Sequence, residues 1–194
     1  MSQRKKTREY KYLERRIREL ERHFDFNQSI NGITKLQSDR LRGLRLLCHA
    51  EFEDYFESIA LKLLERGVKK WERQHIANYN LASLLMEHNR IEKNEPIETK
   101  LYKIVADYRN DVKNNHGIKV DNIKKLFQPL GYRTDNFDAP FLSTLDSYGE
   151  KRGEIAHMSI KRTQQLLDKN DEYNKIEEIL LGIIDFEHII KSVQ

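Results

Sequence analysis

Arg152 and His157 are the two residues of this sequence whose types and spacing best suit chemistry at a phosphate group. A histidine titrates near neutral pH and can accept or donate a proton. An arginine offers a planar fork of donors that fits phosphate oxygens. Glu154 lies three residues before His157 and, on a helix, could hydrogen-bond the imidazole, although a surface glutamate would give the same spacing. These three residues are the candidate catalytic residues.

The helix that carries these residues is predicted to begin near Pro140, because Asp138 stands two residues earlier and proline favours a first helical turn. Its apolar face is formed by Phe141, Leu142, Leu145, Tyr148 and Ile155. At about 100° per residue, Arg152 falls in the middle of that face, whereas His157 lies off it.

The position of Arg152 on an apolar face needs a physical explanation. A guanidinium cannot deprotonate to escape burial, so it requires either an acidic partner or an opening to a site. The long acidic helix earlier in the chain can supply the partner through Glu51, Glu53 or Asp54. The alternative interpretation is a buried ion pair that only ties two helices together.

Three small residues lie between the arginine and the histidine on the helical wheel, namely Gly149, Gly153 and Ala156. Glycine inside a helix costs about 1 kcal/mol relative to alanine, so two of them indicate that a phosphate group or a partner helix approaches the backbone. Gly153 is therefore a candidate substrate-binding position, together with Lys151 in the same local cluster of basic residues.

The remaining elements are also predicted to be helices. Periodic apolar residues indicate helices over residues 10–24, 41–66, 79–88, 96–108, 121–127 and 176–190. Gly67 is expected to end the second of these, and Asp121 is expected to cap the fifth. No segment shows the alternation of a strand, so the sequence predicts an all-α helical bundle.

The first helix is strongly basic. Residues 1–24 hold nine Lys and Arg against four Glu, a net charge of +5, whereas the whole chain carries only +4. We therefore divide the chain into an N-terminal basic amphipathic helix, residues 1–24, and a helical domain, residues 25–194. The apolar spacing of the helix predicts docking, either within the chain or across a dimer. Its charge would serve phosphate binding or simply solvation.

Composition narrows the class of protein. The chain has 194 residues, of which 38% are hydrophobic and 34% charged, with only eight Gly and three Pro, as expected for one unit of long solvated helices. A single cysteine, Cys48, excludes an internal disulfide framework and favours a reducing, cytoplasmic setting. Neither an export signal nor a membrane-spanning segment is expected, since no apolar stretch is long enough.

Metal and cofactor sites are not predicted. His49, Glu53 and Glu57 share one side of a helix and could in principle bind a metal, but a solvated acidic face beside the core is the favoured interpretation. Gly-rich phosphate loops, zinc-binding His-Glu-x-x-His helices and nucleophile elbows are all missing from the sequence.

The sequence Arg152-Gly-Glu-Ile-Ala-His157 resembles the Arg-x4-His motif of the HEPN ribonucleases. The helix around residues 46–55 looks like the early helix of the RiboL-PSP type of HEPN domain, and residues 115–131 look like its mid-chain segment. The resemblance covers roughly residues 33–192 and leaves the basic first helix outside. Gly153 departs from the family pattern, because many catalytic members have Asn, Asp or His at this position.

The resemblance implies a HEPN-like bundle that cleaves RNA without a metal, through attack of the 2′-hydroxyl on the adjacent phosphorus. It also implies a homodimer with facing motifs, since one motif offers one histidine where the reaction needs an acid and a base. RNA and an antitoxin or defence-system protein are the implied partners, in a prokaryotic toxin or antiviral-defence system. A non-catalytic HEPN module that binds a nucleotide, a nucleic acid or a protein is the alternative, and a purely structural dimeric bundle is the third possibility.

Overall fold

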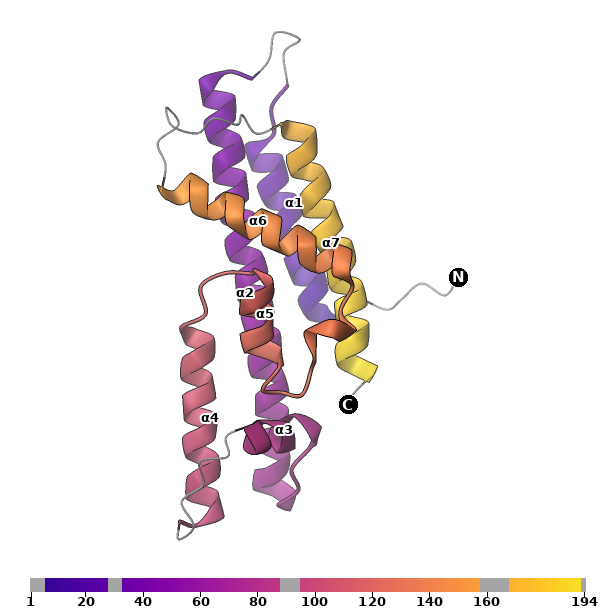
Figure 1. Ribbon diagram of the computed structural model, residues 1–194. Coiled ribbons are helices and arrows are strands. Elements are labelled where there is room, and N and C mark those ends of the chain that lie inside the picture. Colours follow the sequence, from indigo (N-terminus) through magenta and orange to yellow (C-terminus); the bar gives the residue numbers. More distant parts are fainter. Residues whose placement is uncertain (1–5, 28–32, 88–94, 158–167, 193–194) are drawn as a thin grey trace.

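The computed structural model describes residues 6–27, 33–87, 95–157 and 168–192, and the side chains of Ala156 and His157 lie outside this description (Figure 1). The helices are α1 (Arg8–Phe24), α2 (Lys35–Gln74), α3 (Tyr79–Glu87), α4 (Ile97–Lys113), α5 (Val120–Phe127), α6 (Ala139–His157) and α7 (Lys169–Ser192), with a 3-10 turn at Thr134–Asn136. The described residues contain no strand, which confirms the all-α fold class. None of these helices is both long and apolar enough to cross a membrane.

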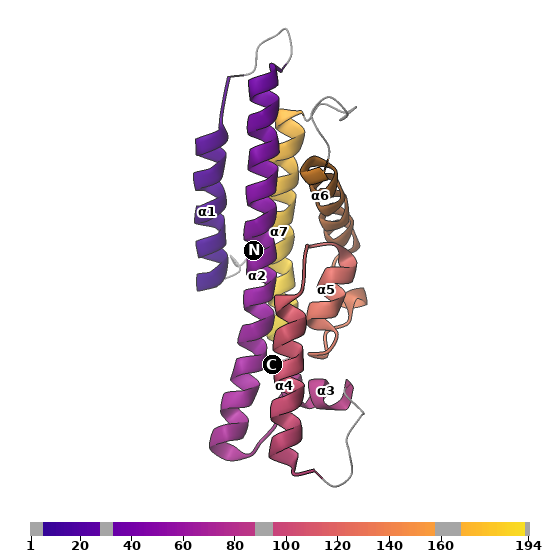
Figure 2. The ribbon, with the colours of Figure 1, turned by 90° about the vertical axis from the view of Figure 1, so that its left-hand side faces the viewer.

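Helix α2 is the axis around which the other helices pack. Helices α1 and α7 run alongside its first half, whereas α3, α4 and α5 lie along its second half (Figure 1). Figure 2 shows α1 on one side of the α2–α7 pair and α6 and α5 on the other. Helix α6, which carries Arg152, crosses both α2 and α7.

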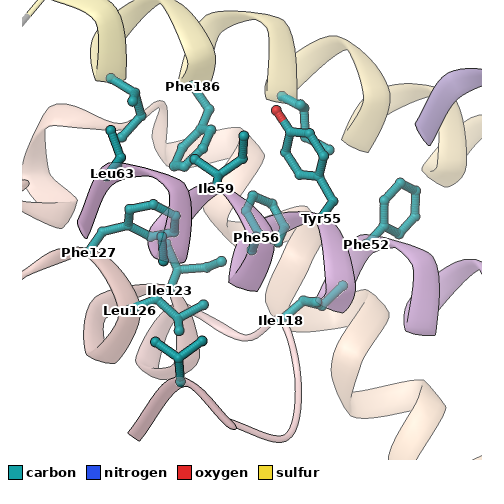
Figure 3. Close-up of a cluster of buried hydrophobic side chains, with 14 of the residues drawn as sticks. Phe52, Tyr55, Phe56, Ile59, Leu63, Ile118, Ile123, Leu126, Phe127 and Phe186 are labelled. Carbon is teal, nitrogen blue, oxygen red and sulfur yellow. The ribbon is translucent and has the colours of Figure 1, made fainter. Parts of the chain in front are cut away.

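The centre of the hydrophobic core lies where α2, α5 and α7 meet (Figure 3). Phe186 of α7 packs edge-on against two rings, with its centroid 5.4 Å from that of Phe56 and 4.9 Å from that of Phe127. The α2 face predicted from the apolar spacing supplies much of this core: Phe52, Tyr55, Phe56, Ile59 and Leu63 are all buried. Edge-to-face pairs of this kind favour one arrangement of the helices over others.

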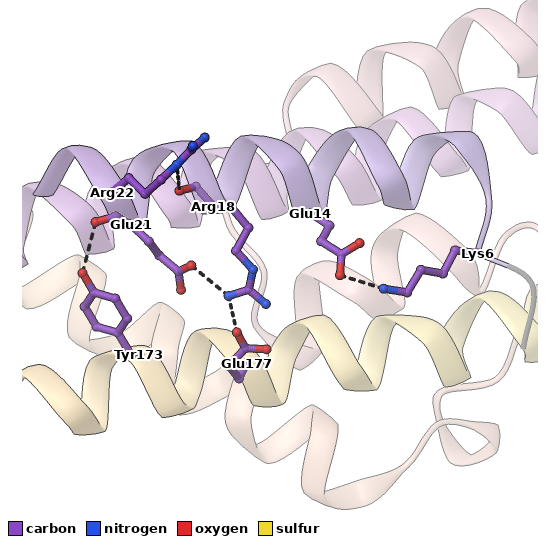
Figure 4. A network of polar contacts seen from close by, with 7 residues as sticks. All are labelled: Lys6, Glu14, Arg18, Glu21, Arg22, Tyr173 and Glu177. Carbon is purple, nitrogen blue, oxygen red and sulfur yellow. Dashed lines mark hydrogen bonds and ion pairs between the residues drawn. The ribbon is translucent and has the colours of Figure 1, made fainter. Parts of the chain in front are cut away.

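Helix α1 docks within the chain, which decides between the two alternatives left open by its sequence. Its apolar seam joins the same core, through Tyr10, Leu13, Ile17 and Leu20. Arg18 pairs with both Glu21, at 2.8 Å, and Glu177 of α7, while the Tyr173 hydroxyl donates to the Glu21 carbonyl (Figure 4). At least one basic residue of α1, Arg18, therefore helps to hold the helix against α7.

Gly67 does not end the second helix as predicted, because α2 continues to Gln74. A Cβ atom at Gly67 would lie 2.5 Å from Asn78 Oδ1 and 2.9 Å from Leu81 Cβ. Glycine is thus required by the close approach of α3, and the helix ends at His75, which has a left-handed φ of 54°.

The prediction that Asp121 caps the short helix is also wrong. Helix α5 begins at Val120, whose N–H donates to Asp146 Oδ1 of α6 at 2.7 Å, and Asp121 lies within the first turn. The prediction for α6 itself is confirmed, since Asp138 Oδ2 accepts from the Phe141 N–H at 3.0 Å. The cap of α5 therefore comes from the helix that carries Arg152, and it ties α6 to the loop before α5.

A fully buried ion pair joins the three helices around the crossing of α6. Arg45 of α2 donates from Nε to Glu172 Oε2 of α7 at 2.9 Å, and each side chain is 1% exposed. The ring of Tyr148 from α6 covers the guanidinium, with the Arg45 Cζ 4.6 Å from its centroid. A buried ion pair that ties two helices together was the structural alternative considered for Arg152. The protein does contain such a pair, but its arginine is Arg45.

We expect Arg45→Met and Glu172→Leu each to lower the free energy of unfolding by about 3–5 kcal/mol, because each leaves one buried charge without its partner. The double variant should recover most of that loss, since it removes both charges. Urea denaturation of the three variants measures this. As a control, Arg109→Ala removes the exposed Arg109–Glu65 pair and should lower the free energy of unfolding by less than about 1 kcal/mol. An Arg45→Met, Glu172→Leu double variant that is no more stable than the single variants would contradict the prediction.

Candidate functional site

Four polar residues lie one helical turn apart along the side of α2 that faces α6 and the loop before α5: Arg45, His49, Glu53 and Glu57. We call them the polar line of α2. His49 is 2% exposed, and both Glu53 and Glu57 are half-buried. The expected solvated acidic face is therefore wrong, because α6 and the loop cover these residues. No group of three or more His, Cys, Asp or Glu in the described ranges is placed to hold a metal ion.

At one end of the polar line, Glu57 anchors the loop that precedes α5. Asn115 Nδ2 donates to Glu57 Oε1 at 2.9 Å and to the Gly117 carbonyl at 3.1 Å, and Asn122 Nδ2 donates to Asn115 Oδ1 at 3.1 Å. Gly117 has a φ of 141°, which favours glycine. Burial raises the pKa of the Glu57 carboxyl, although the hydrogen bond from Asn115 acts in the opposite direction. The loop is thus fixed against α2 by the buried amide of Asn115.

Next along the polar line, His49 and Glu53 are close neighbours. His49 Nδ1 lies 3.5 Å from Glu53 Oε2, and this buried nitrogen makes no well-formed hydrogen bond with any described residue. Burial opposes ionisation of Glu53. The imidazole of His49, the N–H of Gly117 and the charge of Arg152 together outweigh burial and hold the pKa of the Glu53 carboxyl below its ordinary value.

Arg152 lies on the part of α6 that packs over α2 between Arg42 and Phe52, the stretch that holds His49. One turn before it on α6, the ring of Tyr148 contacts that of Phe52, at 6.0 Å between centroids. Three residues after it, the Ile155 carbonyl accepts from Arg42 Nη2 at 3.1 Å. Arg152 itself is half-buried, and its Nε is buried without a hydrogen-bond partner among the described residues.

The three acidic residues considered as partners for Arg152 lie on different sides of α2. Glu51 Oε1 accepts from Arg16 Nε of α1 at 2.9 Å. Asp54 is exposed and lines a shallow groove between α1 and α2. Glu53 belongs to the polar line, and the charge of Arg152 helps to lower the pKa of its carboxyl, so of the three it is the one turned toward α6.

The other candidate residues of α6 are spread around the helix. Lys151 is half-buried beside Lys175 of α7, where burial and, next, the charge of Lys151 lower the pKa of Lys175. Glu154 is exposed. His157 is the last residue of α6, but its side chain lies outside the described residues, and so do its geometry relative to Arg152 and any contact with Glu154.

The two glycines of the small-residue strip on α6, Gly149 and Gly153, have different surroundings. At Gly149 an added Cβ atom would lie 3.0 Å from Lys119 Cγ, so this glycine is explained by close packing against the loop. At Gly153 an added Cβ atom would meet no described residue within 4 Å. Packing among the described residues therefore gives no reason for glycine at the position that follows Arg152.

Sequence reasoning missed Arg45 and the amide of Asn115, and it considered His49 only as a possible metal ligand on a solvated face. Arg45, His49, Glu53 and Glu57 recur every fourth residue, and this was a signal that they share one side of α2. The sequence did not show that this side is covered. That information lies in the loop 114–119 and in α6, which meet α2 only in the folded chain.

A family model described as RiboL-PSP-HEPN matches residues 11–192. No curated protein matches the chain, and no solved structure matches it. The family match confirms the resemblance seen in the Arg-x4-His motif and its flanking segments. It begins inside α1, well before the residue 33 from which the resemblance was expected, whereas the division of the chain after residue 24 stays a prediction.

The two carboxylates of the polar line should respond to pH in opposite ways. The folded-state pKa of Glu53 is lowered, so its charge stabilises the fold above about pH 4.5, and this contribution is lost as pH falls through the lower folded-state pKa. The folded-state pKa of Glu57 is raised, so its contribution is complete below about pH 4.5 and is lost as pH rises through the folded-state pKa.

We therefore expect Glu53→Gln to destabilise the protein at neutral pH and to have little effect in acid. Glu57→Gln should be neutral or stabilising at neutral pH, because an amide oxygen can still accept from Asn115. Urea denaturation over a series of pH values measures both. Shifts of the same sign in the two variants at neutral pH would contradict this assignment.

Gly149→Ala and Gly153→Ala form a matched pair on one helix. We expect Gly153→Ala to raise the free energy of unfolding by up to about 1 kcal/mol, since the added methyl group meets open space and alanine favours helix. Gly149→Ala should gain less, because Lys119 must move to accommodate the methyl group. Thermal unfolding monitored by circular dichroism compares the two, and an equal or larger gain at Gly149 would refute this account of the strip.

Proposed function

This chain belongs to the RiboL-PSP-HEPN family, and on that basis we propose that it is a metal-independent endoribonuclease. In the proposed reaction the ribose 2′-hydroxyl attacks the adjacent phosphorus, and the products carry a 2′,3′-cyclic phosphate and a 5′-hydroxyl. Arg152 and His157 are the proposed reacting pair. Because the sequence offers no cluster of carboxylates and histidines for two divalent ions, the substrate must supply its own nucleophile, which RNA does and DNA does not.

The observation that carries this proposal is the environment of Arg152. Its guanidinium is half-buried, one of its donors is buried without a partner among the described residues, and the next position of the helix is open. A buried donor that lacks a partner is costly unless a ligand supplies the acceptor. A phosphate oxygen would satisfy this donor, and Gly153 would let the phosphate approach the helix.

The proposed roles follow from the chemistry of each side chain. Arg152 offsets the charge that develops on the phosphorane. His157 transfers protons, for which an imidazole is suited near neutral pH, and Glu154 favours its protonated form. Glu53 orients Arg152 from α2. Lys151, close to Lys175, adds positive charge that attracts the RNA backbone.

We further propose that the protein works in the cytoplasm as a homodimer in which the two α6 helices face each other. Two copies would provide two histidines, one as base and one as acid, and the open position at Gly153 leaves room for the second copy or the substrate. By family resemblance the setting is a toxin or antiviral-defence system, in which an antitoxin or defence-system protein restrains the activity.

One observation favours a second candidate function. Gly153 stands where many catalytic members of the family have a polar residue, so the site lacks one hydrogen-bonding group. A non-catalytic module would use the same basic surface around Arg152 and Lys151 to bind a nucleotide, a nucleic acid or a protein partner. Binding without cleavage is its distinguishing property.

The deciding experiment replaces a single ribose by 2′-deoxyribose at a mapped cleavage site and keeps every phosphate. We expect cleavage of the all-ribose strand to continue in excess EDTA, and cleavage at the substituted bond to stop although binding persists, because the nucleophile is gone. End-group analysis of the products and a gel-shift assay measure the two effects.

His157→Ala is the matched control, since it should remove cleavage of the all-ribose strand while the melting temperature stays near that of the wild type. Cleavage at the 2′-deoxy position, or dependence on added magnesium, would mean that water is the nucleophile and that the roles of Arg152 and His157 are wrong. Binding of RNA with no cleavage of any strand would favour the non-catalytic module.

A further inference from the structure

The side of α2 that faces α6 carries a histidine that the proposed reaction does not use. His49 is 2% exposed, and its Nδ1 is buried without a well-formed hydrogen bond to any described residue. Buried polar atoms are almost always satisfied, so an exception of this kind needs an explanation. Since the ring cannot reach RNA from this depth, any role must be exerted through a neighbour.

That neighbour is Glu53, whose carboxylate is approached from three elements. His49 lies on the same helix, with Nδ1 3.5 Å from Oε2. The Gly117 N–H comes from the loop before α5, and the charge of Arg152 comes from α6. Glu57 is the next carboxylate of the polar line, and the charges of Glu53, of Asp54 on α2 and of His116 in the loop all act on its pKa.

Contacts along α6 place the turn that carries Arg152 over the part of α2 that holds His49. Tyr148 contacts Arg45 and Phe52, and the Ile155 carbonyl accepts from Arg42 Nη2, so the α6 turn between them lies over α2 between Arg42 and Phe52, and Glu53 is the next residue along α2. A carboxylate has few acceptor positions. The groups that occupy one oxygen therefore determine how the other oxygen is presented to a neighbouring guanidinium.

We propose that His49 is a positioning residue for Arg152, acting through the Glu53 carboxylate. In the tautomer with its proton on Nδ1, a small turn of the imidazole from its 3.5 Å contact lets it donate to Glu53 Oε2, and Glu53 in turn orients the guanidinium so that its remaining donors face the phosphate. The catalytic consequence rests on the proposed function. The coupling of the three side chains does not, because it is a property of the folded chain whether or not RNA is cut.

The first part of the test measures this coupling without any activity. Side-chain carboxyl carbons are titrated by 13C NMR in the wild type, in His49→Leu and in His49→Asn, whose amide nitrogen can donate from near the position of Nδ1. We expect the pKa of Glu53 to rise in His49→Leu and to stay low in His49→Asn. Glu57, in the same spectra, is the internal comparison and should shift less than Glu53, because among the main causes of its own shift the charge of Glu53 appears but neither His49 nor Arg152 does.

Arg152→Ala provides a second route that leaves the buried histidine in place, in case His49→Leu does not fold. It should also raise the pKa of Glu53, because it removes a neighbouring positive charge. An unchanged Glu53 pKa in both His49→Leu and Arg152→Ala would overturn the inference.

The second part of the test measures cleavage of the all-ribose strand. We expect His49→Leu to lower kcat about tenfold or more with little change in KM, the scale on which partners of a site residue act, and His49→Asn to keep most of the activity. Equal losses in the two variants would overturn the positioning role. A wild-type protein that does not cleave RNA would instead overturn the proposed function, and the Glu53 titration would then decide on His49 alone.

Discussion

The buried pair of Arg45 and Glu172 is the constraint on which the arrangement of the site depends. A guanidinium keeps its charge under all conditions in which the protein folds, so Arg45 can occupy the interior only with Glu172 beside it. The ring of Tyr148 covers the guanidinium of Arg45 on the side of α6. Because these residues come from α2, α7 and α6, the same interaction sets the position of the helix that carries Arg152.

The polar line of α2 extends this constraint toward the loop before α5. Arg45 fixes α6 at one end, and Glu57 fixes the loop through Asn115 at the other. Asp146 of α6 accepts from the Val120 N–H at the start of α5, so α6 is also bonded to the end of this loop. Glu53 lies between these two anchored points, and its carboxyl is affected both by a histidine of its own helix and by the charge of an arginine of another.

The helices could be predicted from the sequence where local signals decide, but not where the neighbours do. Apolar spacing locates α1, α2, α4, α6 and α7, and Asp138 correctly marks the start of α6. The prediction for Gly67 is wrong because this glycine makes room for α3 and does not end α2. The local sequence around Gly67 carries no sign of that packing. For the site, the motif singles out Arg152, and the acidic candidates include Glu53. The burial of His49 depends on segments about 70–100 residues further along the chain, which no local pattern of α2 reports.

The order of the buried pair along the chain has a consequence for biosynthesis. Arg45 and Glu172 are separated by 127 residues, and α6 is made before α7. A ribosome therefore completes the helix with Arg152 and His157 while Arg45 still lacks its counter-charge, and α6 cannot settle over a guanidinium that remains hydrated. Helix α7, which is translated after the motif helix, is the one that permits the site to assemble, so a nascent chain that lacks α7 carries the motif residues without their final arrangement.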